Sequence, residues 1–203
     1  MIKIFLIRHS GPFLQLNYEN SITFEQRNNT MILDDIGLEK AKKLLEINQL
    51  NAITNIYSTN STRSIQTLHF LANHNTTTIK IDDLLNERKF GVEFIDELPQ
   101  DFIIRQFEDK NYKLHNGESL NDVKKRMQEF YKKICHLNDV IIGIHGIALF
   151  AFIEMFCETS YDGKTFKIFN SNKLIYDKMI ENPDVFELQI DNNKLIKLIN
   201  HCL

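Results

Sequence analysis

Four short segments of the sequence combine cations, imidazoles and a carboxyl group in a way that suits chemistry on a phosphate. They are Arg8-His9, Arg63, Glu87-Arg88 and His145-Gly146. Arginine side chains match the geometry of phosphate oxygens. An unprotonated imidazole is a nucleophile near neutral pH, and a carboxyl group can serve as a general acid. If the fold brings these segments together, they form an anion site with a nucleophile and a proton donor.

Buried strands should position both histidines. The run Met1 to Ile7 is apolar except for Lys3, and Val140 to Ile144 is a second apolar run that ends at His145. Continuous apolar runs of this length are typical of strands that are buried on both faces of a parallel sheet. Open α/β folds bind ligands at the carboxyl ends of such strands. We therefore expect the four segments to meet at this edge of the sheet.

The remaining pattern alternates short strands with helices. We expect strands at 52–58, 77–81, 172–176 and 185–190, a further strand or a tail at 194–199, and helices at 37–48, 61–72, 100–109, 119–137 and 147–156. Residues 13–35 read as a long loop or an irregular short helix. Alternation of this kind predicts an α/β fold, a three-layer α/β/α sandwich with a mostly parallel central sheet. The last strands have no helices between them, so we expect an antiparallel edge strand. Residues 1–203 should form one domain.

The amino-acid composition of the chain limits which kinds of binding partner and which cell compartment we expect. The chain has 203 residues and a net charge of −3, without a dense run of lysine and arginine, which argues against a nucleic-acid binder. Its three cysteines are widely spaced, as in reduced intracellular proteins. Because the first strand should begin at Met1, we expect no signal peptide, and no apolar run is long enough to cross a membrane. We expect a cytoplasmic protein with no membrane partner, as a monomer or a homodimer.

The sequence resembles the histidine phosphatase superfamily, also called the phosphoglycerate-mutase-like group. Five segments carry the resemblance in the family's order: Leu6-Ile7-Arg8-His9, Ser58 to Thr67 around Arg63, Leu85 to Gly91 around Glu87, Gly117-Glu118-Ser119 with Arg126, and His145-Gly146. Each of these motifs is weak when taken alone. Their common order across most of the chain makes the resemblance specific.

The resemblance implies a covalent mechanism. His9 would attack phosphorus to form a phosphohistidine, and its other ring nitrogen needs an acceptor, for which we expect a backbone carbonyl. Arg8, Arg63 and a protonated or donating His145, beside Gly146, would bind the phosphoryl oxygens. Glu87 would protonate the leaving group and later take a proton from water. The resemblance implies no metal and no cofactor.

Several assignments are open from the sequence. Asp82, Asp83 or Glu93 could replace Glu87 as the proton donor, and Arg88 either lines the mouth of the substrate site or faces solvent. The family usually has an asparagine six residues after the nucleophile, where this chain has Gln15, with Asn17 two residues further on. Either amide could donate to phosphate in its place. The preceding Ser10-Gly11-Pro12 also departs from the family's pattern.

The activity that we expect is hydrolysis of phosphomonoesters of small metabolites. A mutase of the phosphoglycerate type usually has a longer insertion, rich in tryptophan, before the Gly-Glu-Ser segment. This chain has only about 25 residues there and no tryptophan at all, so water should reach the phosphohistidine. A phosphoprotein phosphatase and a catalytically silent binder of phosphorylated ligands are also compatible with the motifs. A silent relative should have lost His9, Arg63, Glu87 or His145, and all four are present.

Overall fold

Strand β1 (Ile2–Arg8) lies inside a six-stranded sheet whose order is β3-β2-β4-β1-β8-β9. The computed structural model describes residues 1–13 and 22–201. β1 pairs in parallel with β4 (Asp139–Ile144), which pairs in parallel with β2 (Ile56–Ser58), and β2 pairs in parallel with β3 (Ile79–Ile81). The parallel register aligns Arg8 with Ile144, so the two histidines that follow these residues leave the sheet side by side.

The other side of β1 carries the antiparallel part of the sheet. β8 (Asp184–Asp191) runs antiparallel to β1, and β9 (Lys194–His201) runs antiparallel to β8 at the edge. The expected antiparallel pairing at one edge of the sheet is therefore confirmed. The alternative of a tail over 194–199 is wrong, because these residues belong to an edge strand of eight residues.

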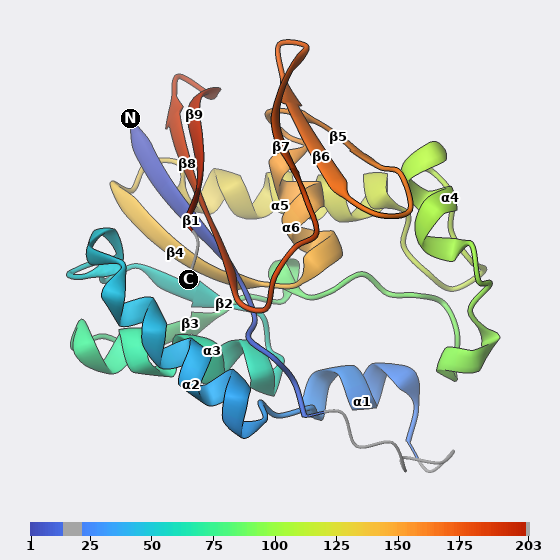
Figure 1. Ribbon diagram of the computed structural model, residues 1–203, viewed down its shortest axis with the longest axis horizontal. Helices are drawn as coiled ribbons and strands as arrows, with labels where there is room; N and C mark the ends of the chain where they lie inside the picture. Colours follow the sequence, from blue (N-terminus) through green and yellow to red (C-terminus); the bar gives the residue numbers. More distant parts are fainter. Residues whose placement is uncertain (14–21, 202–203) are drawn as a thin grey trace.

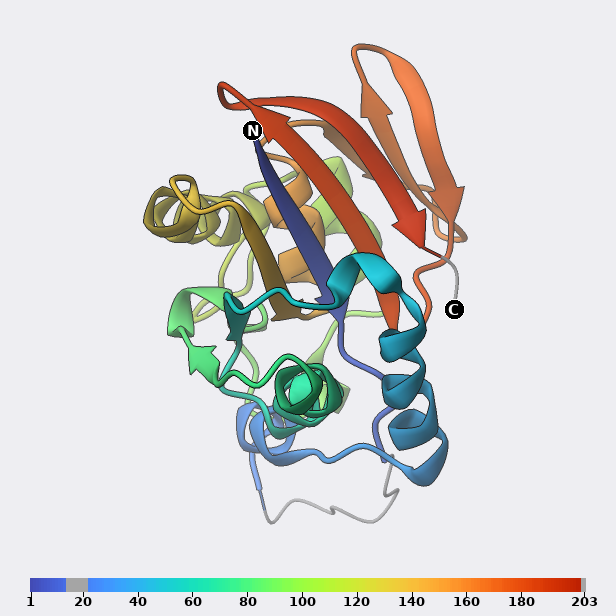
Figure 2. The same cartoon turned by 90° about the vertical axis from the view of Figure 1, so that its left-hand side faces the viewer.

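Both faces of the sheet are buried under helices, as the apolar character of β1 predicted. Ile4 and Leu6 face one core with α5 (Leu120–Ile134) and α6 (Gly146–Ile153), whereas Phe5 and Ile7 face the other. That second core lies under α3 (Thr62–His74) and under residues 44–50, which follow α2 (Asp35–Lys43). Figures 1 and 2 show α2 and α3 on one side of the sheet and α5 and α6 on the opposite side, which completes the three-layer sandwich.

A second, smaller sheet was not anticipated in full. β5 (Glu158–Tyr161), β6 (Phe166–Asn170) and β7 (Lys173–Lys178) form an antiparallel meander, of which only the last strand was predicted. The meander packs against α6 through stacked aromatic rings, and the ring centroids of Phe166 and Phe150 lie 4.3 Å apart. Its strands are short and half-exposed, so tertiary packing rather than a period-two pattern stabilises them.

The remaining helices differ from the expectations mainly at their ends. α1 (Phe24–Thr30) lies in the stretch expected to be a loop or an irregular short helix, and Thr23 and Gln26 begin it with a capping box. The C-terminal part of the expected helix 37–48 consists of two 3-10 turns, Leu44–Glu46 and Asn48–Leu50. α4 (Phe102–Glu108) is shorter than expected. Ser119 and Asp122 begin α5 with a capping box. Within the described residues, each helix is too short or too polar to cross a membrane.

Candidate active site

Side chains from three strand ends meet at the carboxyl edge of the sheet. His9 follows β1 and His145 follows β4, and their ring centroids lie 5.0 Å apart. Arg63, in the first turn of α3 after β2, directs Nη2 to 2.9 Å from Nδ1 of His145. The predicted convergence of these residues is therefore present in the fold. The parallel register explains it, because β1, β4 and β2 end at one level of the sheet.

The ring of His9 is held by one hydrogen bond to its own backbone segment. Nδ1 lies 2.8 Å from the carbonyl oxygen of Ser10, and a carbonyl can only accept, so Nδ1 carries the proton of the neutral ring. Nε2 then carries the lone pair, and no side chain or backbone group of the described residues bonds to it. Asn182 donates from Nδ2 to the carbonyl oxygen of His9, 3.2 Å away, and so ties the residue to the loop before β8. The geometry leaves His9 as a neutral, oriented imidazole with one free nitrogen.

Burial keeps His9 and His145 uncharged. Only 7% of His9 is exposed, and burial, followed by the charge of Arg63, lowers the pKa of His9 to about 3. Burial, followed by the same arginine, lowers the pKa of His145 well below its usual range. Arg63 itself stays charged at neutral pH, because burial lowers its pKa only to about 10. Of the two forms expected for His145, the structure therefore favours the neutral one over the protonated one.

These pKa shifts predict that acid destabilises the fold. In the unfolded chain His9 takes up a proton near pH 6.5, but in the folded protein only near pH 3. Between these two pH values the unfolded chain binds more protons than the folded protein. The free energy of unfolding therefore has its full value above about pH 6.5 and decreases as the pH falls from there toward 3. His9 alone should account for about 2 kcal/mol of the loss between about pH 6.5 and 5. Urea unfolding at about pH 7 and 5 measures it. His9→Gln should lose less stability than the wild type, and an equal loss would contradict the assignment.

His145 is oriented by three neighbours rather than standing free. Because an arginine can only donate, Nδ1 of His145 accepts from Arg63, and Nε2 must carry the ring proton. Nε2 lies 3.2 Å from Oγ1 of Thr59 and 3.1 Å from Oγ of Ser61. Ser61 occupies the N-cap position of α3, but its hydroxyl makes no cap bond. Sequence reasoning missed the contacts of Thr59 and Ser61 with the imidazole.

Arg63 and Arg8 also contact residues that the sequence did not suggest. Arg63 donates through Nη1 to the carbonyl oxygen of Asn28 in α1 and through Nη2 to its Oδ1, 3.4 Å away. Arg8 donates from Nη1 to the carbonyl oxygen of Ile180 at 2.7 Å, 172 residues away along the chain. Its buried Nε finds no acceptor among the described residues. A Cβ atom on Gly146 would lie 3.7 Å from this Nε, so the guanidinium lies beside the first turn of α6.

Glu87 joins the site through the N-terminus of α6. Its Oε1 accepts from the backbone N–H of Ala148 at 3.2 Å, and Oε2 from that of Ile147 at 3.4 Å. Oε1 also accepts from the N–H of Arg88 at 2.8 Å. Burial lowers the pKa of both Arg8 and Arg63, and the nearby carboxylate of Glu87 offsets part of this lowering. The fold therefore brings the carboxylate of Glu87 to the N-terminus of α6 and close to Arg8 and Arg63.

The side chain of Arg88 is buried and bonded within the protein. It is only 2% exposed, donates to the carbonyl oxygen of Tyr112 at 3.0 Å and to Gln106 and Glu118, and covers the ring of Phe102. The solvent-facing alternative is wrong. The donors of the guanidinium are directed at protein acceptors near α4. Arg88 also lines the cavity that opens beside Glu87, and its place at the mouth of the substrate site stays a prediction. Gln15 and Asn17, the candidate phosphate contacts, lie outside the described residues.

The unusual segment Ser10-Gly11-Pro12 packs internally. Ser10 is buried and donates from Oγ to the carbonyl oxygen of Gly37 at 2.7 Å. A Cβ atom on Gly37 would lie 2.1 Å from the carbonyl oxygen of Gly11, so only glycine fits there. Pro12 forms a β-bridge with Leu33. The segment thus joins the start of α2 to the end of β1.

A cavity of about 330 Å³ opens beside Glu87. The lining includes Phe24 and Phe90, whose rings meet edge to face with centroids 5.0 Å apart. Polar lining comes from Asn28, which contacts Arg63, and from Lys89. The cavity is of the size that holds small molecules. A larger cavity of about 610 Å³ lies between α2 and the loop before β8, and none of the predicted site residues lines it.

Known proteins resemble this chain in sequence pattern and in fold. The sequence model of the histidine phosphatase superfamily (branch 1) matches residues 4–175. A mycobacterial glucosyl-3-phosphoglycerate phosphatase superposes with a TM-score of 0.70 at 16% identity, covering 98% of this chain and 96% of that one. YhfR of Bacillus stearothermophilus gives 0.69 at 18% identity, with 96% and 94% covered. TTHB049 of Thermus thermophilus gives 0.66 at 14%, with both chains fully covered. A search of curated protein sequences finds no match.

Proposed function

The chain belongs to the histidine phosphatase superfamily, branch 1, and from this membership we propose that it hydrolyses phosphomonoesters of small metabolites through a phosphohistidine on His9. The observation that carries the proposal is the state of His9. Its Nδ1 donates to the carbonyl oxygen of Ser10, and its pKa is lowered to about 3. Nε2 is therefore unprotonated at neutral pH and available to attack phosphorus without a separate base.

In the first step, the lone pair of Nε2 forms a bond to phosphorus while the bond from phosphorus to the ester oxygen breaks. Glu87 gives its proton to that oxygen, so the leaving group departs as a neutral alcohol. Arg63 and Arg8 balance the charge on the phosphoryl oxygens. On binding, the phosphoryl oxygens accept hydrogen bonds from Arg63 in place of Asn28. They also accept from Nε of Arg8, for which the described residues provide no acceptor.

In the second step, water replaces the imidazole. The carboxylate of Glu87 takes a proton from water while the oxygen of that water bonds to phosphorus, and the bond from Nε2 of His9 to phosphorus breaks. His9 returns to its neutral form, and Glu87 is protonated for the next cycle. His145 acts as a fixed neighbour that accepts from Arg63 and so helps hold the guanidinium close to His9.

The cavity beside Glu87 supports a small, polar leaving group. It borders the carboxylate that would protonate the ester oxygen, and Asn28, Asn60, Asn86 and Lys89 contribute to its lining. Amide and ammonium groups bind hydroxyl and carboxylate groups, as in sugars and hydroxy acids. A volume of about 330 Å³ admits such a metabolite but not a folded partner.

Hydrolysis of 4-nitrophenyl phosphate by the purified protein tests the proposal. The rate should be unchanged after exhaustive treatment with EDTA, because the proposed steps use only protein groups. Release of inorganic phosphate should match release of nitrophenol at steady state. Activity that requires added divalent metal would overturn the mechanism. Transfer of the phosphoryl group to a second position of a metabolite, without phosphate release, would indicate a mutase instead.

A further inference from the structure

The loop that carries Glu87 has little regular structure of its own. It follows the 3-10 turn Asp83–Leu85, and residues 86–90 lie in neither a helix nor a strand. The carboxylate reaches the amides of Ile147 and Ala148 at 3.4 and 3.2 Å, near the upper limit for a hydrogen bond. A small displacement of the loop would break both contacts. Something outside the loop must therefore fix its position.

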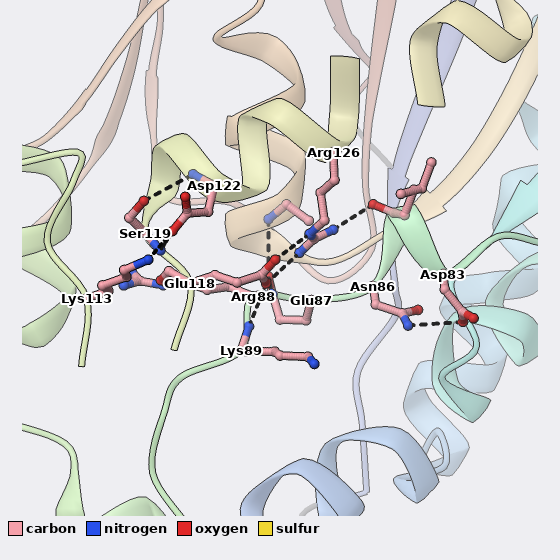
Figure 3. Close-up of polar contacts among 12 residues, drawn as sticks. Asp83, Asn86, Glu87, Arg88, Lys89, Lys113, Glu118, Ser119, Asp122 and Arg126 are labelled. Atoms are coloured by element: carbon pink, nitrogen blue, oxygen red, sulfur yellow. Dashed lines mark hydrogen bonds and ion pairs between the residues drawn. The ribbon is translucent and has the colours of Figure 1, made fainter. Parts of the chain in front are cut away.

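Glu118 and Arg126 form hydrogen bonds to the chain before and after Glu87. Arg126 pairs with Glu118 through two bonds, Nε to Oε1 at 2.9 Å and Nη2 to Oε2 at 3.1 Å. Its remaining Nη1 donates to the carbonyl oxygen of Leu84 at 2.6 Å, three residues before Glu87. Glu118 accepts from the N–H of Lys89 at 2.9 Å and donates its own N–H to the carbonyl oxygen of Lys89 at 2.8 Å. Figure 3 shows Arg126, Glu118 and Lys89 in this arrangement, next to Glu87.

Close backbone packing keeps the two segments in register. A Cβ atom on Gly91 would lie 2.5 Å from the backbone nitrogen of Gly117, and Gly91 has a φ of +82°. A Cβ atom on Gly117 would lie 2.8 Å from the carbonyl oxygen of Phe90. These contacts allow no side chain between the loop and the turn that carries Glu118. The position of Glu118 is thus transmitted directly to the loop.

Glu118 is not required to begin α5. Ser119 is the N-cap of that helix, and its capping box with Asp122 already satisfies the first turn. The carboxylate of Glu118 is directed instead at Lys89 and Arg126. Both side chains are largely covered, with 14% of Arg126 and 22% of Glu118 exposed. The pair is therefore placed to hold the loop rather than to cap the helix.

We propose that Glu118 and Arg126 are positioning residues, which place the carboxylate of Glu87 at the N-terminus of α6 and so beside the leaving-group oxygen. They act through Glu87 and touch no reacting atom. The inference rests on the proposed function for the role of Glu87 as proton donor. It assigns to the pair an effect on proton transfer that a general contribution to stability would not produce.

Two substrates separate these roles. Glu118→Gln should lower kcat/KM about tenfold for an alkyl phosphate, whose leaving group needs a proton, and about twofold or less for 4-nitrophenyl phosphate. In a Glu87→Gln background it should cause no further loss, because the group through which it acts is absent. Arg126→Lys, which keeps the charge but cannot bridge Glu118 and Leu84, should show the same split. Equal losses on both substrates, or losses that add to those of Glu87→Gln, would overturn the proposal.

Lys113→Gln is the matched control. Lys113 forms an ion pair with Asp122 at 2.8 Å at the start of the same helix, and among the described residues it makes no hydrogen bond or ion pair with the loop. It should leave both rates unchanged.

Amide hydrogen exchange tests positioning without activity. Glu87→Ala removes the acceptor of the Ala148 N–H and should speed its exchange. Glu118→Gln should do the same, whereas Lys113→Gln should not. A wild type without phosphatase activity would refute the proposed function, and the exchange rates would still decide whether the pair positions Glu87. Unchanged exchange at Ala148 in Glu118→Gln would refute the positioning itself.

Discussion

Replacing His9 with alanine should reduce phosphatase activity by about four orders of magnitude or more. No other described group is placed to attack phosphorus in its stead, because the ring of His145 is engaged on both nitrogens, by Arg63 and by the hydroxyls of Thr59 and Ser61. Arg8 and Arg63 would remain, so the variant should still bind inorganic phosphate. Loss of turnover with retained binding would identify His9 as the nucleophile.

Trapping of the intermediate makes this prediction specific. Brief mixing with labelled phosphomonoester, followed by denaturation in alkali, should leave label on the wild type, since phosphohistidine is stable in alkali and labile in acid. His9→Ala should carry no label. His69→Ala is a suitable control, because His69 is exposed on α3 and its contacts, with Phe70 and Asn73, stay within the same helix. Label that persists in His9→Ala would place the nucleophile elsewhere.

Replacing Glu87 with glutamine should have the second-largest effect, and it should depend on the leaving group. A glutamine cannot supply a proton, so kcat for an alkyl phosphate should fall by about 10²- to 10⁴-fold. Nitrophenolate leaves without protonation, so the loss with 4-nitrophenyl phosphate should be far smaller in the first step. The amide keeps one acceptor for the N–H groups of Ala148 and Arg88 that now bond to Oε1, which limits structural damage.

The other carboxylates of this region provide the comparison. Glu93→Gln changes a carboxyl group that lines the same cavity, and it should not reproduce the dependence on the leaving group. Asp83 is engaged by the amides of Asn60 and Asn86, and Asp82 by Lys133 and the N–H of Leu84. Equal losses on both substrates in Glu87→Gln would remove Glu87 from the role of proton donor. A larger split in Glu93→Gln would move that role to Glu93.

The amino-acid sequence predicted the strands that position the site, because the pattern of apolar residues indicates which strands are buried. A run of apolar residues such as Ile2 to Ile7 can be stable only with both faces covered, so β1 had to lie inside the sheet. Parallel strands end at one edge, and this placed His9 and His145 together. The short, half-exposed strands β5 and β6 carry no comparable pattern, and their aromatic contacts with α6 arise only in the folded chain.

The tertiary structure alone decided how each functional group is held. A residue type shows that an imidazole or a guanidinium is present, but its tautomer and direction depend on the acceptors around it. The proton of His9 is placed by the carbonyl of Ser10, and Arg8 is held by the carbonyl of Ile180, far along the chain. Hydrogen-bond partners likewise determine that Arg88 is buried against the carbonyl of Tyr112 and that Arg126 bonds to the carbonyl of Leu84, before Glu87. Glu118 bonds to the N–H of Lys89, after Glu87. Backbone carbonyls are common to every residue, so no sequence motif marks them, and only folding brings a particular one within reach of a side chain.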